Sequence, residues 1–143
     1  MKTFKQVRDE LKLLIEDVPS LAGAPVVLEH GGGDVEAEVE SALATKGLVV
    51  CVWMASGAVR DQISRGVASL RVSLPVSLIE NPAVNKGASL EDALQALLRG
   101  VIGRRCGDGE LSLGGEVFAR ASGEAGELET VVGFEAPVLV RAG

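Results

Sequence analysis

The chain has 143 residues, of which 47% are apolar, and its formal net charge is −6. A chain of this length and composition can bury a sizeable core without disulfides, so we expect a single domain over residues 1–143. With 20 acidic against 14 basic residues, no Tyr and one Trp, it is poorly suited to binding phosphate backbones or stacking on bases. We therefore expect no direct sequence-specific nucleic-acid binding.

An amphipathic helix is predicted at the start of the chain. Apolar residues recur at three- and four-residue steps from Phe4 to Val18, which is typical of a helix with one buried face. Pro19 disfavours helical geometry at the residue before it and ends the helix. The segment lacks the apolar core of a signal peptide, and no apolar run approaches the ~20 residues that cross a bilayer. We expect a soluble cytoplasmic protein with no membrane partner.

A short strand at Pro25–Glu29 and a second helix from Asp34 to Lys46 follow. The first half of this helix also alternates Val or Ala with Glu, as a strand would. The longer window favours a helix, because an apolar stripe continues at helical spacing, Asp34 is a good N-cap, and Gly47 supplies a C-terminal signal.

Two long strands are predicted in the middle of the chain. Leu48–Ala55 is apolar throughout, as expected of a central strand covered on both faces, and should pair with Val67–Ile79. The polar stretch between them, Ser56–Gly66, is longer than a tight hairpin needs. We interpret it as a surface loop, the kind of segment that often carries function.

The second long strand alternates strictly. One face carries Leu70, Val72, Leu74, Val76 and Leu78, and the other carries Ser69, Arg71, Ser73, Pro75 and Ser77. This period of two predicts a half-buried strand. Because proline cannot donate a ladder hydrogen bond, Pro75 predicts a sheet edge or a bulge, and an edge is where another subunit can attach.

A turn and a capped helix come next. Asn81-Pro82 is turn chemistry, and Ser89 with Asp92 at the third helical position predicts a capping box. Apolar residues then follow at helical spacing, and they are Leu90, Ala93, Leu94, Leu97, Leu98 and Val101. This stripe should pack across the sheet, and Gly100 and Gly103 mark the helix end. Arg99, Arg104 and Arg105 are interpreted as a cationic complement to that end.

The C-terminal part is predicted to be a loop, Gly103–Gly109, and two antiparallel strands, Glu116–Ala121 and Glu129–Arg141, joined by a turn at 122–126. Pro137 in the last strand again predicts an edge. The predicted fold class is α+β, an α/β sandwich in which a mixed, mainly antiparallel sheet packs against two or three helices.

The strongest candidate for a catalytic motif is His30-Gly31-Gly32-Gly33, since such a segment can supply oxyanion-hole amides. His30 is the only histidine, so a Ser-His-Asp triad has no general base left. The segment Glu110–Gly114 lacks the first glycine of a nucleophile elbow. We interpret the motif as a turn with an exposed histidine and expect no enzyme activity.

Cofactor and metal motifs are equally weak. Phosphate binding by the glycines before Asp34 is opposed by the carboxylates that follow, and one histidine without Cys-x-x-Cys argues against zinc. We expect no cofactor and no metal. Cys51 lies in an apolar run and Cys106 in a Gly-rich loop, so they should differ in burial and stay reduced.

The order helix, strand, helix, two long strands, helix, two strands, together with Glu80-Asn81-Pro82-Ala83-Val84-Asn85 before a capped helix, resembles small phage and prophage tail-completion proteins. The tail terminator and minor tail protein group is the family we name. The resemblance covers Phe4 to about Ile102, including the unit Asp34–Trp53, and carries no catalytic residues with it.

The resemblance implies a structural α/β subunit that forms a ring, commonly a hexamer, at the end of a tail tube. Its partners would be copies of itself and tail-tube and head-completion proteins, in the virion tail and, during assembly, the host cytoplasm. We expect self-assembly through edge strands and the Ser56–Gly66 loop, with the interface residues Arg60, Asp61, Arg65, Arg71 and Pro75. The alternative is a small-molecule-binding or regulatory α+β domain without catalysis, which a monomer with a deep apolar pocket would favour; a weak hydrolase ranks third.

Overall fold

The computed structural model describes residues 2–30, 34–121 and 126–141, with the backbone alone for 59–64 and 116–121. Its helices are α1 (Phe4–Glu16), the short 3-10 helix η1 (Pro19–Leu21), α2 (Val35–Thr45) and α3 (Leu90–Val101). Its strands are β1 (Val26–Leu28), β2 (Leu48–Val52), β3 (Ser56–Ser64), β4 (Val67–Glu80), β5 (Arg105–Cys106), β6 (Gly109–Glu110), β7 (Ser112–Ala121) and β8 (Leu128–Arg141).

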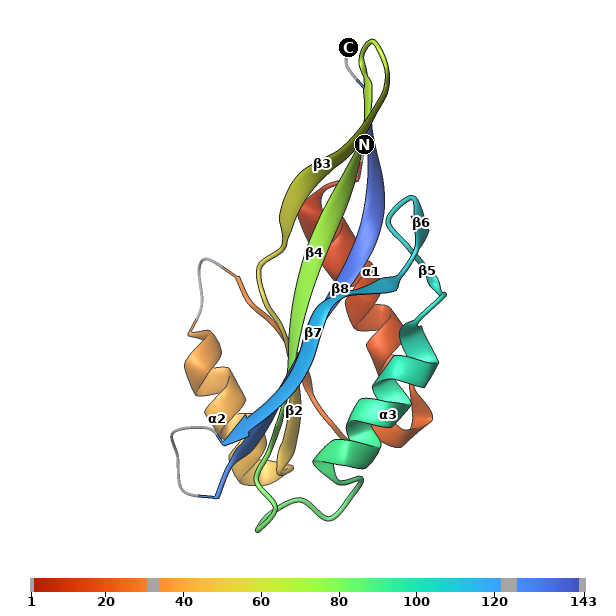
Figure 1. Cartoon of the computed structure of the whole chain (residues 1–143). Coiled ribbons are helices and arrows are strands. Elements are labelled where there is room, and N and C mark those ends of the chain that lie inside the picture. The colour runs from red at the N-terminus through yellow and green to blue at the C-terminus, as the bar shows by residue number, and fades with distance from the viewer. Residues whose placement is uncertain (1, 31–33, 122–125, 142–143) are drawn as a thin grey trace.

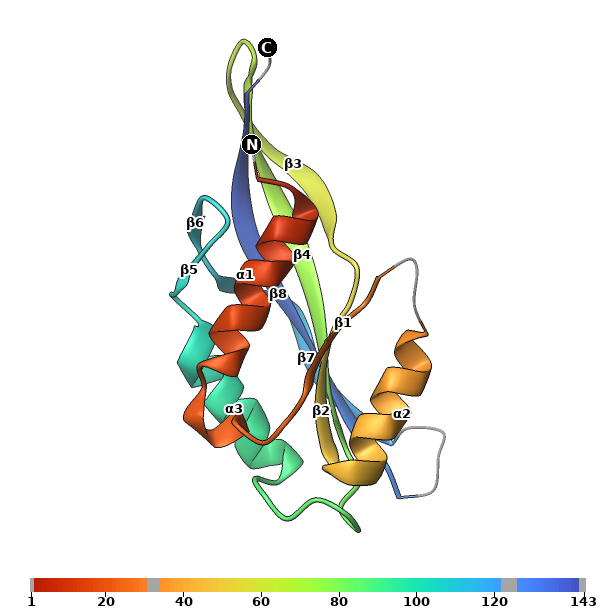
Figure 2. The same ribbon diagram turned by 180° about the vertical axis from the view of Figure 1, so that it is seen from behind.

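Six strands form one sheet in the order β1-β2-β4-β8-β7, with β3 also paired to β4 (Figure 1). β1 runs parallel to β2, and the other pairs in this sheet are antiparallel. Helices α1 and α3 lie on one face of the sheet and α2 on the other (Figure 2). The predicted α+β class with a mixed, mainly antiparallel sheet is confirmed.

The spine of the sheet is the pair β4 and β8. They pair along their full length, from Val67 opposite Arg141 to Glu80 opposite Leu128. On the other side of β4, β2 pairs with the last five residues and β3 with the first half, from Ser73 to Val67. The turn between β3 and β4 therefore projects at one end of the molecule, beside the end of β8 (Figure 1).

The prediction of a surface loop at Ser56–Gly66 is wrong, because this segment forms β3 and its turn. β4 has 14 residues and β2 only five, so the first half of β4 would otherwise expose a row of unpaired backbone groups. Gly66, with φ of +79°, turns the chain back onto it. Two register shifts along β3 blur the alternation that would have marked a strand in the sequence.

The edge predicted from Pro75 is also wrong, since β4 is an interior strand. In an antiparallel ladder, the N–H and C=O of one residue face the same neighbour. The Pro75 carbonyl accepts a 3.0 Å bond from the Trp53 N–H, so its missing donor faces the stretch 53–55, where the chain passes from β2 to β3. A proline is tolerated in this interior strand because the neighbouring ladder is interrupted there.

The larger core lies between the sheet and helices α1 and α3, and it confirms the predicted face of β4. The buried side chains of this layer that come from the two long strands are Val72, Leu74, Val76, Leu78, Val132, Phe134, Ala136 and Val138. From α3, Leu90, Ala93, Leu97 and Val101 are buried, while Leu94 and Leu98 are only partly buried.

A smaller core lies under α2 on the opposite face. Its buried residues are Val39, Ala42, Leu43, Val49, Cys51 and Ile79. β2 is therefore covered on both faces, as its apolar sequence predicted. Ser77, predicted to be on the polar face of β4, is buried here and accepts a 2.8 Å hydrogen bond from the Trp53 indole N–H.

Local signals set the helix ends. Thr3 and Gln6 form a full capping box at α1, Asp34 caps α2 by accepting from the Ala37 N–H, and the Ser89 hydroxyl accepts from the Asp92 N–H at α3. Each satisfies a backbone donor that the first helical turn leaves unpaired. The predicted starts of α2 and α3 are therefore confirmed.

The two C-terminal strands are confirmed, and the turn predicted at 122–126 lies, apart from Gly126, outside the described residues. The stretch predicted as the loop Gly103–Gly109 instead contributes to a small hairpin of β5 and β6. The edge predicted from Pro137 holds locally, because β7 pairs with β8 only as far as Glu135. Beyond that point, this side of β8 meets the hairpin.

Candidate functional site

The five residues predicted at an oligomer interface do not converge. Arg65 is exposed in the β3–β4 turn, Arg71 is exposed on β4, and Pro75 is half-buried inside the sheet. At ~3.3 Å per residue, the stretch of β4 from Val67 to Pro75 spans about 26 Å. Arg60 and Asp61 belong to β3, and their side chains lie outside the described residues. The surface that they define is a line along the hairpin, not a patch.

Arg71 has a partner across the β4–β8 ladder. Its Nε lies 3.4 Å from Oε1 of Glu135. The arginine side chain is half exposed, and an exposed pair of this kind contributes ~0–1 kcal/mol to stability. The contact orients the side chain on the open face of the sheet.

The HGGG segment provides no catalytic arrangement in the described part of the chain. His30 is exposed, as predicted, and its Nε2 lies 3.7 Å from a Glu38 oxygen; residues 31–33 lie outside the described residues. Within the described ranges no group of three or more His, Cys, Asp or Glu side chains is placed to hold a metal ion. None of the described helices is long and apolar enough to span a membrane.

The free strand edges are β1 and β3 on one side of the described sheet and β7 on the other. β7 is interrupted by a register shift between Leu113 and Val117. A Cβ on Gly114, inside this bulge, would lie 2.0 Å from the Glu135 side chain. Bulges of this kind hinder edge-to-edge pairing with another sheet, and β3 carries two register shifts of its own, so neither edge is regular along its whole length.

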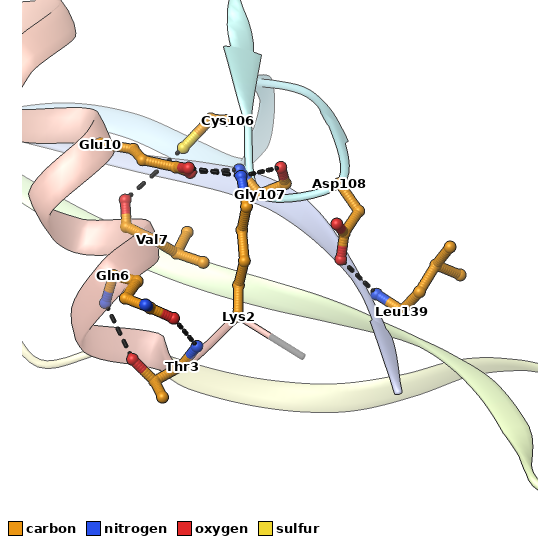
Figure 3. A network of polar contacts seen from close by, with 9 residues as sticks. All are labelled: Lys2, Thr3, Gln6, Val7, Glu10, Cys106, Gly107, Asp108 and Leu139. Atoms are coloured by element: carbon orange, nitrogen blue, oxygen red, sulfur yellow. Dashed lines mark hydrogen bonds and ion pairs between the residues drawn. The ribbon is translucent and has the colours of Figure 1, made fainter. Parts of the chain in front are cut away.

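A polar network ties the start of α1 to the β5–β6 hairpin (Figure 3). The Lys2 ammonium pairs with the Glu10 carboxylate and donates a 2.9 Å bond to the Gly107 carbonyl. The other Glu10 oxygen accepts from the Gly107 N–H at 2.7 Å. The hydrogen bond that Lys2 donates to the Glu10 carboxylate is the main cause of the raised pKa of Lys2.

The same hairpin closes the free side of β8. The Asp108 N–H donates to the Pro137 carbonyl at 2.7 Å, and its carboxylate accepts from the Leu139 N–H at 2.8 Å. Gly107 has φ of +66°, and a Cβ there would lie 2.4 Å from the Pro137 carbonyl oxygen. The glycine is required because the backbones approach so closely. The network in Figure 3 is a structural clamp.

Cys106 is buried in this clamp, so the prediction that it differs from Cys51 in burial is wrong. Its thiol lies 3.6 Å from the Val7 carbonyl, on α1, and both cysteines are free. Burial raises the pKa of Cys51 to about 12 and that of Cys106 to about 11. A thiolate is the nucleophile in cysteine chemistry, and at neutral pH neither cysteine supplies one.

Alkylation by iodoacetamide at pH 8 is expected to be slow in the folded protein and fast for both thiols in urea. Because the folded pKa values lie above that of an unfolded thiol, ~8.5, unfolding releases protons at alkaline pH. The contribution of the two buried thiols to the free energy of unfolding is therefore fully present below about pH 8 and is lost as the pH rises toward 11. Urea melts at pH 8 and pH 10 check this, and alkylation of the native protein at the unfolded rate would contradict it.

The groove beside α2 was not predicted from the sequence. It has a volume of about 900 Å³, and its apolar lining includes Val35, Val39, Leu43, Trp53 and Ile79. Glu36 and Glu40 from α2, Glu127 just before β8 and Glu129 from β8 also line it. Trp53 is half-buried, and its N–H is donated to Ser77. The sequence signal was Glu36 and Glu40, spaced i,i+4 and hence on one side of the helix.

No protein-family model and no curated protein matches the chain. Among solved structures, it is similar to a chain in the virion of a native gene transfer agent (GTA) particle, with a TM-score of 0.56 and 18% sequence identity. The match covers 94% of this chain and 92% of that chain. At this identity the similarity shows a shared fold across nearly the whole of both chains.

Proposed function

We propose that the chain is a structural component of a phage-like particle, a single tail-terminator-like domain that forms a ring at the end of the tail tube. The observation that carries this is the fold shared with a chain of the GTA virion over 94% of one chain and 92% of the other. Its partners would be further copies of itself and tail-tube and head-completion proteins, and its locations the virion tail and, during assembly, the host cytoplasm.

The surface of the molecule supports a role in assembly. A ring needs two different contact surfaces on each subunit, and the chain offers a projecting β3–β4 hairpin at one end and a groove beside α2 toward the other (Figure 1). Arg60, Asp61, Arg65 and Arg71 belong to the hairpin, and we propose these four as contact residues. Pro75 lies inside the sheet, so in this proposal it borders the contact surface and is not itself a contact residue.

The purified chain is expected to form closed rings of one defined size as its concentration rises. Mass photometry and negative-stain electron microscopy over a range of concentrations and salt would show them, with and without tail tubes. The tubes matter because a ring can require its neighbour as a template. If the purified chain stays monomeric at every concentration and salt tested and does not bind the ends of tail tubes, the proposal is contradicted. It would favour a small-molecule-binding domain that uses the α2 groove.

A further inference from the structure

The α2 groove has the chemistry of a receptor for arginine. Its lining is apolar and contains Trp53, whose ring carries a negative π face that attracts guanidinium groups. The Trp53 N–H is already donated to Ser77, so the indole has no donor to offer a ligand. On α2, Glu36 and Glu40 are exposed, and within the described part of the chain neither forms an ion pair. Carboxylates accept the two parallel hydrogen bonds that arginine donates.

The opposite end of the molecule carries the matching group. We call this end the hairpin tip. It consists of residues 65–69, in the β3–β4 turn and the start of β4, and of residues 139–141 at the end of β8. Val67 pairs with Arg141, so Arg65 and Arg141 lie at the same end of the sheet. Both are exposed and are the charged residues within these two ranges, while Asp61 on β3 lies opposite Ser69 and the Asp108 carboxylate accepts from the Leu139 N–H. This end therefore offers two exposed arginines, and the groove offers carboxylates, on a chain whose net charge is −6.

The hairpin tip and α2, which lines the groove, lie far apart on one subunit (Figures 1 and 2), so a subunit does not place its tip in its own groove. A contact between two different surfaces is heterologous, and repeated head to tail it closes into a ring when its rotation divides a full turn. In a two-fold dimer each tip would have to enter the other subunit's groove at the same time, so the number of subunits in the assembly distinguishes a reciprocal dimer from a ring.

We propose that the hairpin tip of one subunit docks in the α2 groove of the next, with Arg65 and Arg141 on the Glu36 and Glu40 carboxylates and beside Trp53. This inference rests on the proposed function, because it assigns the contact that builds the ring. It also explains why the groove combines an apolar lining with acidic side chains. The apolar area supplies affinity and the charge pairs set the orientation.

Charge reversal tests the contact in the full chain. The tip variant Arg65→Glu with Arg141→Glu is expected to weaken self-association about tenfold or more, since it replaces attraction by repulsion. The groove variant Glu36→Arg with Glu40→Arg should do the same. The four-residue variant that combines both changes should assemble again, because its charges are exchanged and its net charge is unchanged.

The matched control is Arg104→Glu with Arg105→Glu. These arginines are also exposed and belong neither to the tip nor to the groove lining. The control has the same net charge as the tip variant. It is expected to assemble like the unmodified chain. Circular dichroism and urea melts of all variants establish that each one is folded.

Trp53 gives a second readout, because it is the only tryptophan and the chain has no tyrosine. Covering the groove should shift its emission to shorter wavelength as concentration rises, in the unmodified chain and the control but not in the tip variant. Rings that form equally well in the tip and groove variants would overturn this contact while leaving the ring function intact. Absence of self-association at every concentration also overturns it, and tube binding then decides the ring function separately.

Discussion

Replacing Leu97 by Ala is expected to lower the free energy of unfolding by about 2–5 kcal/mol. Leu97 is 0% exposed and lies in the core between α3 and the sheet, together with Val72 and Leu74. The truncation removes apolar contacts and leaves a cavity that packed neighbours fill only in part. Domains of this size have a total stability of ~5–15 kcal/mol, so a large fraction would be lost. Urea unfolding followed by circular dichroism measures the change.

The matched control is Leu13→Ala, the same substitution in another helix. Leu13 is 63% exposed on α1, so its removal should change stability by less than about 0.5 kcal/mol. Leu94→Ala, at a partly buried position of α3, should fall between the two. Equal effects of Leu97→Ala and Leu13→Ala would mean that α3 presents a different face to the sheet.

The helices could be predicted because their signals are local. The caps Asp34 and Ser89 act within three residues of themselves, and a buried face repeats within one or two turns. The same holds for the alternation of β4, whose predicted face is fully buried from Val72 to Leu78 and partly buried at Leu70. What these signals do not contain is which strand lies beside which.

The errors come from that missing information. Pro75 has no backbone N–H, and at a sheet edge no neighbouring strand would lack a hydrogen bond because of it. The structure meets the same requirement inside the sheet, at the break between β2 and β3. The segment Ser56–Gly66 was interpreted as a loop because its polar composition does not reveal that half of the long strand β4 lacks a partner.

Burial of Cys106 and formation of the α2 groove are likewise set by distant residues. Cys106 is covered because Glu10 on α1 and Pro137 on β8 hold the Gly107–Asp108 backbone. The groove joins α2 to residues near the start of β8, about ninety positions later in the chain. The sequence predicted that Arg65 contributes to an interface, whereas the groove proposed to bind it could be recognised only from the fold.

Replacing Glu80 by Ala is expected to lower the free energy of unfolding by about 2–4 kcal/mol. This is the largest change that we expect from a substitution outside the apolar core. The sequence indicated only that a strand ends there. In the structure its side chain is buried, with one oxygen accepting from the Leu90 N–H at 3.2 Å and the other from the Asn85 amide at 2.6 Å. Leu90 is the first residue of α3, so the carboxylate also faces the positive end of the helix dipole.

The loss should be large because the surrounding loop cannot move to compensate. Asn85 donates to the Ala88 carbonyl as well as to Glu80, and a Cβ on Gly47 would lie 2.2 Å from the Asn85 nitrogen. Without the carboxylate, the Leu90 N–H becomes a buried donor with no acceptor, which costs about 1–3 kcal/mol by itself.

Glu91→Ala is the control, since it removes an exposed carboxylate from the first turn of the same helix and should cost only ~0.3–1 kcal/mol through the helix dipole. Glu80→Gln keeps the shape and one acceptor oxygen, so it should lie between the two alanine variants. Urea melts give the stabilities, and hydrogen exchange of the Leu90 amide should accelerate in Glu80→Ala but not in Glu91→Ala. If the two alanine variants lose the same stability and Leu90 stays protected in both, the Glu80 carboxylate is not what anchors α3 to the end of β4.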